Sequence, residues 1–90
     1  MTVTVSVYEK QGLCRGPGIG NATFDAVFGF IPVSLTATNG GPLSGMTHVY
    51  TVAAPSGSSA WNLRVDAPRF QQWTFFVRDG EVHEVWLSRG

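Results

Sequence analysis

Few side chains in this sequence are of the kinds that perform acid–base, nucleophilic or metal chemistry. General acid–base catalysis needs ionisable groups held together, and a nucleophile needs a base beside it. The carboxylates are instead scattered along the chain, as Glu9, Asp25, Asp66, Asp79, Glu81 and Glu84. Asp79 and Glu81 are close but belong to an expected turn. We therefore expect a protein that is not an enzyme.

The two histidines and the single cysteine lie far apart in the sequence. His48 falls in an apolar segment, which favours a hydrogen-bonded core or interface residue over a metal ligand. His83 and Glu84 are neighbours in an expected strand, so their side chains point to opposite faces and do not form a dyad. Cys14 has no partner for an internal disulfide, and no short Cys/His spacing predicts a metal site. We expect no cofactor and no metal.

Charged residues are scarce and unevenly placed. They make up 13% of the chain, about half the usual quarter. None occurs between Asp25 and Arg64. Interface cores are depleted in charge, so this segment predicts a covered surface in an assembly, with a Ser/Thr-rich β surface as the alternative. The net charge of zero argues against nucleic acid or an anionic membrane as a partner.

Alternating apolar residues predict short strands in a single β domain, 1–90. The inward sets are Val3, Val5 and Val7; Val33, Leu35 and Ala37; and Trp61, Leu63 and Val65. About six strands, separated by turn signals, indicate an all-β fold, a small antiparallel β-sandwich or barrel. Residues 12–21 are rich in glycine and predict a loop or arm. Residues 22–31 carry an i, i+3, i+4, i+7 pattern that allows one short helical turn.

Asp79-Gly80 gives the clearest local signal. Asp-Gly is a preferred pair for a two-residue type I′ turn, so the apolar segments on either side predict a C-terminal hairpin. In that register Trp73 lies opposite Trp86. Glu84 falls on the same face as a partly buried acid or, as we favour, it lies at the edge of an apolar patch or in a register shifted by one residue. Both faces of the hairpin are apolar, which indicates a covering layer from this chain or a neighbour.

These features predict a non-enzymatic structural protein that acts through protein–protein contacts in a homo-oligomer or larger assembly. A small virion subunit, such as a bacteriophage capsid decoration or tail protein, has this general character. We expect synthesis in the cytoplasm without a signal peptide, and residence in the virion. The side chains expected at the interface are Trp73, Trp86, Phe76, Leu87, Trp61, Tyr50 and Ile19. Trp73 and Trp86 are the expected anchors, with an intramolecular core role as the alternative.

Two other functions stay open. A carbohydrate-binding module would use the tryptophans, with Tyr8 and Tyr50, as stacking platforms. A small inhibitor or regulator that covers a target's site would also lack catalytic residues and would expose apolar patches. No apolar run approaches the length of about 18 residues that a membrane span needs, so we expect no membrane insertion.

Overall fold

A computed structural model describes residues 1–40, 43 and 45–90, and these form nine strands and no α-helix. The all-β class is confirmed, with more strands than the six expected. The strands are β1 (Thr2–Gln11), β2 (Cys14–Gly18), β3 (Thr23–Phe28), β4 (Ile31–Ser34), β5 (Ala37–Asn39), β6 (Val49–Ala53), β7 (Ala60–Asp66), β8 (Trp73–Arg78) and β9 (Val82–Leu87).

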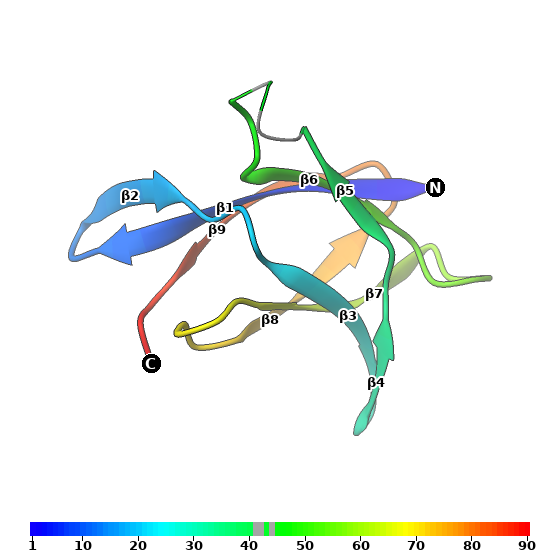
Figure 1. Ribbon diagram of the computed structural model, residues 1–90. Helices are drawn as coiled ribbons and strands as arrows, with labels where there is room; N and C mark the ends of the chain where they lie inside the picture. The colour runs from blue at the N-terminus through cyan, green and yellow to red at the C-terminus, as the bar shows by residue number, and fades with distance from the viewer. Residues whose placement is uncertain (41–42, 44) are drawn as a thin grey trace.

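Two sheets wrap around one core (Figure 1). In the first sheet β1 is central: its first half pairs antiparallel with β6 and its second half with β2, while β9 runs parallel along the opposite edge. β5 extends this sheet beyond β6. The second sheet is antiparallel, in the order β4-β3-β7-β8.

The core lies between the two sheets. Two of the three predicted inward sets are confirmed, because the three valines of β1 and the Trp61 set of β7 are all buried. The third set is partly wrong. Leu35 and Ala37 pack against the core, but Val33 is 42% exposed. Val33 lies in β4, on a hairpin that projects beyond the body (Figure 1), so its inward face has little to cover it.

The helical turn allowed for residues 22–31 is wrong, because this segment forms β3 and the start of β4. Phe24 and Ala26 alternate into the core, as strand residues do. Gly29, with φ 64°, is the first of two turn residues between Phe28 and Ile31, and the second has no positive φ. That is the type II′ geometry, whose twist matches a hairpin.

The glycine-rich segment predicted as a loop or arm contains β2, which pairs with the end of β1 in a hairpin that extends from the body (Figure 1). Gly12, with φ 60°, is again the first of two turn residues. Gly18 is required for a different reason. A Cβ added there would lie 2.4 Å from the Cβ of His48. Glycine thus lets β2 pass directly beside His48.

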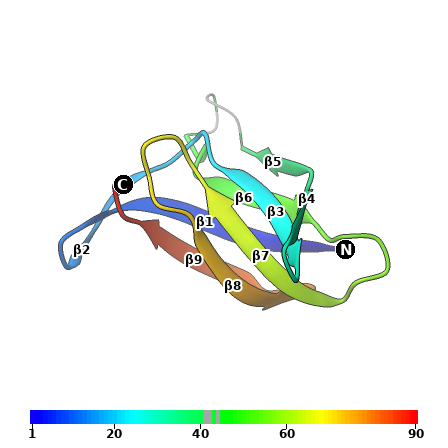
Figure 2. The ribbon, with the colours of Figure 1, turned by 90° about the horizontal axis from the view of Figure 1, so that it is seen from below.

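The C-terminal segment turns at Asp79-Gly80 as predicted, but the two flanking strands do not pair with each other. β8 pairs with β7 in the second sheet, and β9 pairs with β1 in the first (Figure 2). Trp73 therefore lies opposite Val65, and Trp86 lies beside Tyr8. The predicted register between Trp73 and Trp86 is wrong.

The turn type explains the missing ladder. Gly80 has φ 82°, but Asp79 has no positive φ, which excludes type I′ and fits type II. Types I and II do not match the twist of paired strands and splay them apart. The turn therefore carries the chain from one sheet to the other.

Candidate functional site

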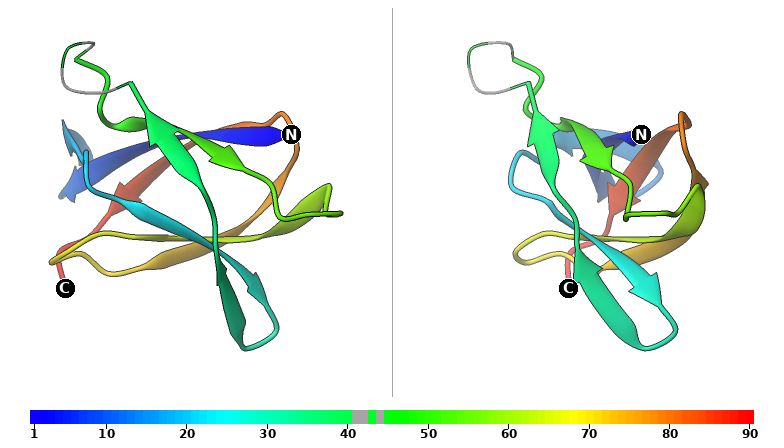
Figure 3. Two further views of the ribbon diagram at one scale, coloured as in Figure 1. Left: turned by 45° about the vertical axis from the view of Figure 1, so that its right-hand side comes forward. Right: turned by 90° about the vertical axis from the view of Figure 1, so that its right-hand side faces the viewer.

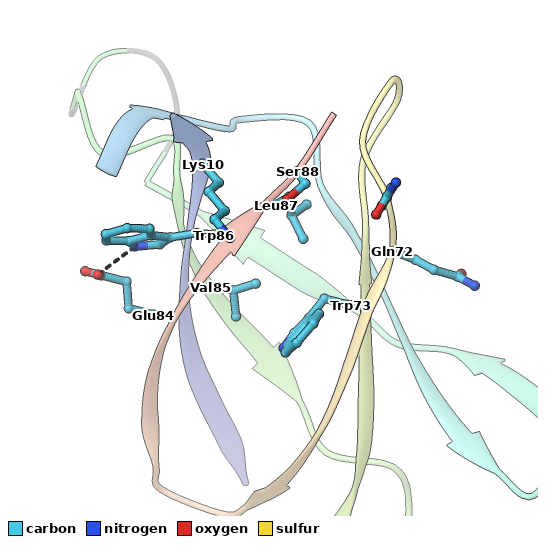
Figure 4. A pocket seen from close by; sticks show the side chains of 9 residues that line it. Lys10, Gln72, Trp73, Glu84, Val85, Trp86, Leu87 and Ser88 are labelled. Carbon is cyan, nitrogen blue, oxygen red and sulfur yellow. Dashed lines mark hydrogen bonds between the residues drawn. The ribbon is translucent and has the colours of Figure 1, made fainter. Parts of the chain in front are cut away.

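The seam, defined as the gap between β8 and β9, is closed by backbone hydrogen bonds at both ends and has no backbone pairing between them. The Phe75 ring of β8 and the His83 ring of β9 pack across it, with centroids 5.1 Å apart. At the turn, the Glu81 N–H donates to the Arg78 carbonyl at 3.2 Å. At the other end, the Gln71 N–H donates to the Ser88 carbonyl at 2.7 Å, next to a bridge that joins residues 70 and 89. Between these ends the two strands run without pairing to each other (Figure 4).

Both strands turn an unpaired edge toward the seam. The Asp79 N–H donates to the Ser59 carbonyl at 2.9 Å, so by alternation the backbone groups of Thr74 and Phe76 point away from β7. The Thr4 N–H donates to the Glu81 carbonyl at 3.0 Å, so the even-numbered residues of β9 point away from β1. Within the described residues, no strand pairs with either edge.

A cavity of about 320 Å³ lies in the seam. Its lining residues come from three elements and the flanking segments: Lys10, Gln71, Gln72, Trp73, Glu84, Val85, Trp86, Leu87 and Ser88. The Trp73 indole is 58% exposed and lies between the two strands in Figure 4. Val85 and Leu87 are buried core residues. The lining thus combines the exposed Trp73 and two buried core residues with polar side chains, among them Lys10 and Glu84.

Trp86 lies on the opposite side of β9 from Trp73 (Figure 4). Its Nε1–H donates to Glu84 Oε2 at 2.9 Å, and Arg15 Nη1 donates to Glu84 Oε1 at 3.1 Å. Arg15 also lies over the Tyr8 ring, 4.5 Å from its centroid. Glu84 is exposed and is not a buried acid. It shares its face with Trp86 but not with Trp73.

Four of the seven expected interface residues are core residues of the single chain: Trp61, Leu87, Tyr50 and Ile19. The Tyr50 hydroxyl accepts a hydrogen bond from the Ala22 N–H at 3.0 Å and donates one to the Ile19 carbonyl at 2.7 Å. Burial raises the pKa of the Tyr50 phenol. These four side chains stabilise the fold, so Trp73, Phe76 and the half-buried Trp86 are the expected residues that reach the surface.

A group of exposed apolar side chains at the end of one hairpin was not predicted from the sequence. We call it the hairpin knob: Phe28, Phe30, Ile31 and Val33, at the end of the β3–β4 hairpin. Phe30, in the turn, is fully exposed, and Ile31 is 68% exposed. The hairpin projects from the body in both views of Figure 3. A glycine-first turn between apolar strands, inside the charge-free segment, is the signal that would have found it.

The edge of β4 is unsuited to adding another strand. Phe28 and Ile31 close the two-residue turn, so the nitrogen of Pro32 points away from β3. Proline has no N–H to donate, and natural proteins use it to blunt exposed edges. Contacts of this hairpin therefore depend on its side chains rather than on its backbone.

Within residues 1–40, 43 and 45–90, no group of three or more His, Cys, Asp or Glu side chains is placed to hold a metal ion. The same residues include no helix long and apolar enough to cross a membrane. No protein-family model, curated protein or solved structure matches the chain.

Proposed function

We propose that this protein is a subunit of a protein assembly and makes its contacts through the hairpin knob. The observation that carries the proposal is the group of four exposed apolar side chains on a projecting hairpin. A soluble surface normally disperses such residues, and a contiguous patch marks an interaction site. The absence of charged residues between Asp25 and Arg64 fits the same surface, because interface cores are depleted in charge.

The exposed apolar area of the hairpin knob is about half of what one partner contributes to a standard interface. Its exposed fractions correspond to on the order of 400–500 Å² of apolar surface, given about 200 Å² for a fully exposed phenylalanine. One partner in a standard interface contributes about 800 Å². The knob therefore supports association, and further contact around it would complete an interface. A virion is the assembly suggested by the sequence, and that assignment stays a prediction.

Carbohydrate binding is less well supported by this geometry. Two aromatic rings that stack on one saccharide must lie on the same side of a site. Trp73 and Trp86 both line the seam cavity, but their rings lie on opposite sides of β9 (Figure 4), and Trp61 is buried.

The proposal is tested by light scattering after size exclusion, over a dilution series. Wild-type protein is expected to show a mass that rises with concentration, and F30S is expected to stay monomeric over the same range. L13S is the matched control, because Leu13 is 97% exposed in the other glycine-first turn. A monomeric wild type, or equal masses for wild type and F30S, would overturn the proposal.

A further inference from the structure

We infer that two copies of this chain can exchange β9, so that the strand of each copy pairs with β1 of the other. The exchange hinges at Asp79-Gly80 and produces a closed dimer. It does not use the hairpin knob, so it is a second mode of association that stands apart from the proposed function. The partner is a second copy, because that copy supplies an identical strand and an identical acceptor edge.

The backbone pairing of β9 is made with a strand that precedes the hinge in the chain. β9 runs parallel to β1 along its whole length, from Thr4 beside Val82 to Glu9 beside Leu87. It does not pair with β8, from which the chain turns directly into it (Figure 2). A β9 from a second copy therefore meets the same edge of β1, and the dimer needs no new surface.

This acceptor site offers both buried apolar area and charge complementarity. Val85 and Leu87 of β9 are buried in the core. Beyond the strand, Arg89 Nε donates to Glu9 Oε1 at 2.8 Å. The backbone contacts at the far end of the seam join residues 70–71 to 88–89. In each case one side precedes the hinge and the other follows it, so all of these contacts re-form between copies.

The closed turn contains a group that favours its opening. Both carboxylate oxygens of Asp79 are buried, and within the described residues neither has a hydrogen-bond partner. A buried carboxylate without a partner is costly, and an extended hinge returns it to water. Opening also breaks two hydrogen bonds between Arg78 and Glu81. Arg78 is exposed, so water replaces its partner groups there.

The shortness of the connection favours exchange as well. Short hinges under strain are the connections at which strands are swapped between copies. Here two residues carry the chain from one sheet to the other, and no ladder between β8 and β9 opposes their separation. Gly80, with φ 82°, is the residue that allows so short a turn to close.

The first test identifies which copy supplies β9. Thr4 and Val82 are paired neighbours on β1 and β9, and Val82 is 74% exposed. T4C and V82C are introduced into separate chains, each of which also carries C14S, to remove the native cysteine, and F30S, to remove the knob contact. The two chains are unfolded together in urea and refolded at high protein concentration under oxidising conditions.

The expected product is a disulfide-linked dimer with one chain of each kind, identified by mass spectrometry. The control is the same pair of chains mixed only after separate refolding, which is expected to give much less of this product. Equal yields from the two procedures, or no mixed dimer, would overturn the inference. Either result leaves the proposed function intact, because that function is judged from the native dilution series of wild type and F30S.

The second test changes the hinge in the same C14S and F30S background. G80V strains the closed turn, because valine is disfavoured at positive φ, and it suits an extended hinge. It is expected to raise the dimerisation constant after refolding at least about tenfold, the effect of about 1.4 kcal/mol of strain. G57V is the matched control. Gly57 has φ 78° and, like Gly80, no atom within 4 Å of an added Cβ, but it lies in the loop between β6 and β7.

D79N removes the unpartnered charge from the closed turn and is expected to lower the dimer yield below that of the unchanged hinge. Size exclusion with light scattering measures the dimer in all three variants. Equal amounts of dimer from G80V and G57V, or more dimer from D79N than from the unchanged hinge, would overturn the inference.

Discussion

The Tyr50 hydroxyl donates a hydrogen bond to the Ile19 carbonyl over 2.7 Å, from one buried residue to another. The same oxygen accepts from the Ala22 N–H at 3.0 Å. The segment between these two residues carries the chain from β2 in the first sheet to β3 in the second. A single phenol in β6 therefore fixes the backbone where the chain changes sheets.

The variant Y50F is expected to unfold about 1–2 kcal/mol more easily than wild type at pH 7, because two backbone groups lose their hydrogen-bond partner. Urea denaturation with fluorescence detection measures the difference. Y8F is the control, since the Tyr8 hydroxyl makes no hydrogen bond within the described residues. Equal losses in Y50F and Y8F would contradict the role assigned to Tyr50.

Tyr50 also predicts a dependence of stability on alkaline pH. Burial raises its pKa in the folded protein above the ordinary value of 10.0, so the fold favours the neutral phenol. The contribution of Tyr50 to the free energy of unfolding is fully present below the pKa that its phenol has in the unfolded chain. It is lost as the pH rises through the higher pKa of the folded protein. Wild type is expected to lose more stability than Y50F between pH 9 and pH 11 (about the range of a tyrosine titration). Parallel stability profiles for the two proteins would exclude this linkage.

The ion pair of Glu81 predicts that the stability of the fold falls at acid pH. A hydrogen bond with His83 and a second from the Arg78 N–H lower the pKa of the Glu81 carboxyl below 4.5. The contribution of Glu81 to the free energy of unfolding is fully present above the pKa that its carboxyl has in the unfolded chain. It is lost as the pH falls through the lower pKa of the folded protein. The melting temperature of E81Q should therefore change less than that of wild type as the pH falls through this range. An identical change in both would show that Glu81 is not coupled to folding.

Gly18 predicts a steric effect that a second substitution relieves. G18A places a Cβ 2.4 Å from that of His48 and is expected to cost about 2 kcal/mol, as overpacking does. In the background H48G the same substitution is expected to cost much less. A double-mutant cycle by thermal unfolding measures the coupling. Independent, additive effects would place the strain elsewhere.

Local alternation was enough to predict the all-β class and most of the core. The valines of β1 and the Trp61 set of β7 are buried as expected, because both strands are covered by the opposite sheet. Val33 has the same pattern and is exposed, since alternation says which residues share a face but not whether another layer reaches it.

The Asp-Gly pair correctly predicted where the chain turns, at residues 79–80, but it did not predict the type of the turn. Asp-Gly suits a type I′ turn, and here Asp79 has no positive φ. The alternative partners of β8 and β9 lie far away in the sequence, in β7 and β1. Long-range pairing overrode the local preference, and this is why the seam and its cavity were not predicted.

The parallel pairing of β1 with β9 has a consequence for how the protein folds. It joins Val5 to His83, nearly the full length of the chain apart. Contacts of such high sequence separation slow folding, because the entropy of closing the loop is lost before the contact forms. During synthesis one edge of β1 stays unpaired until β9 has been made. Folding is therefore expected to be slow, and the chain is most open to misassembly while this β1 edge is exposed.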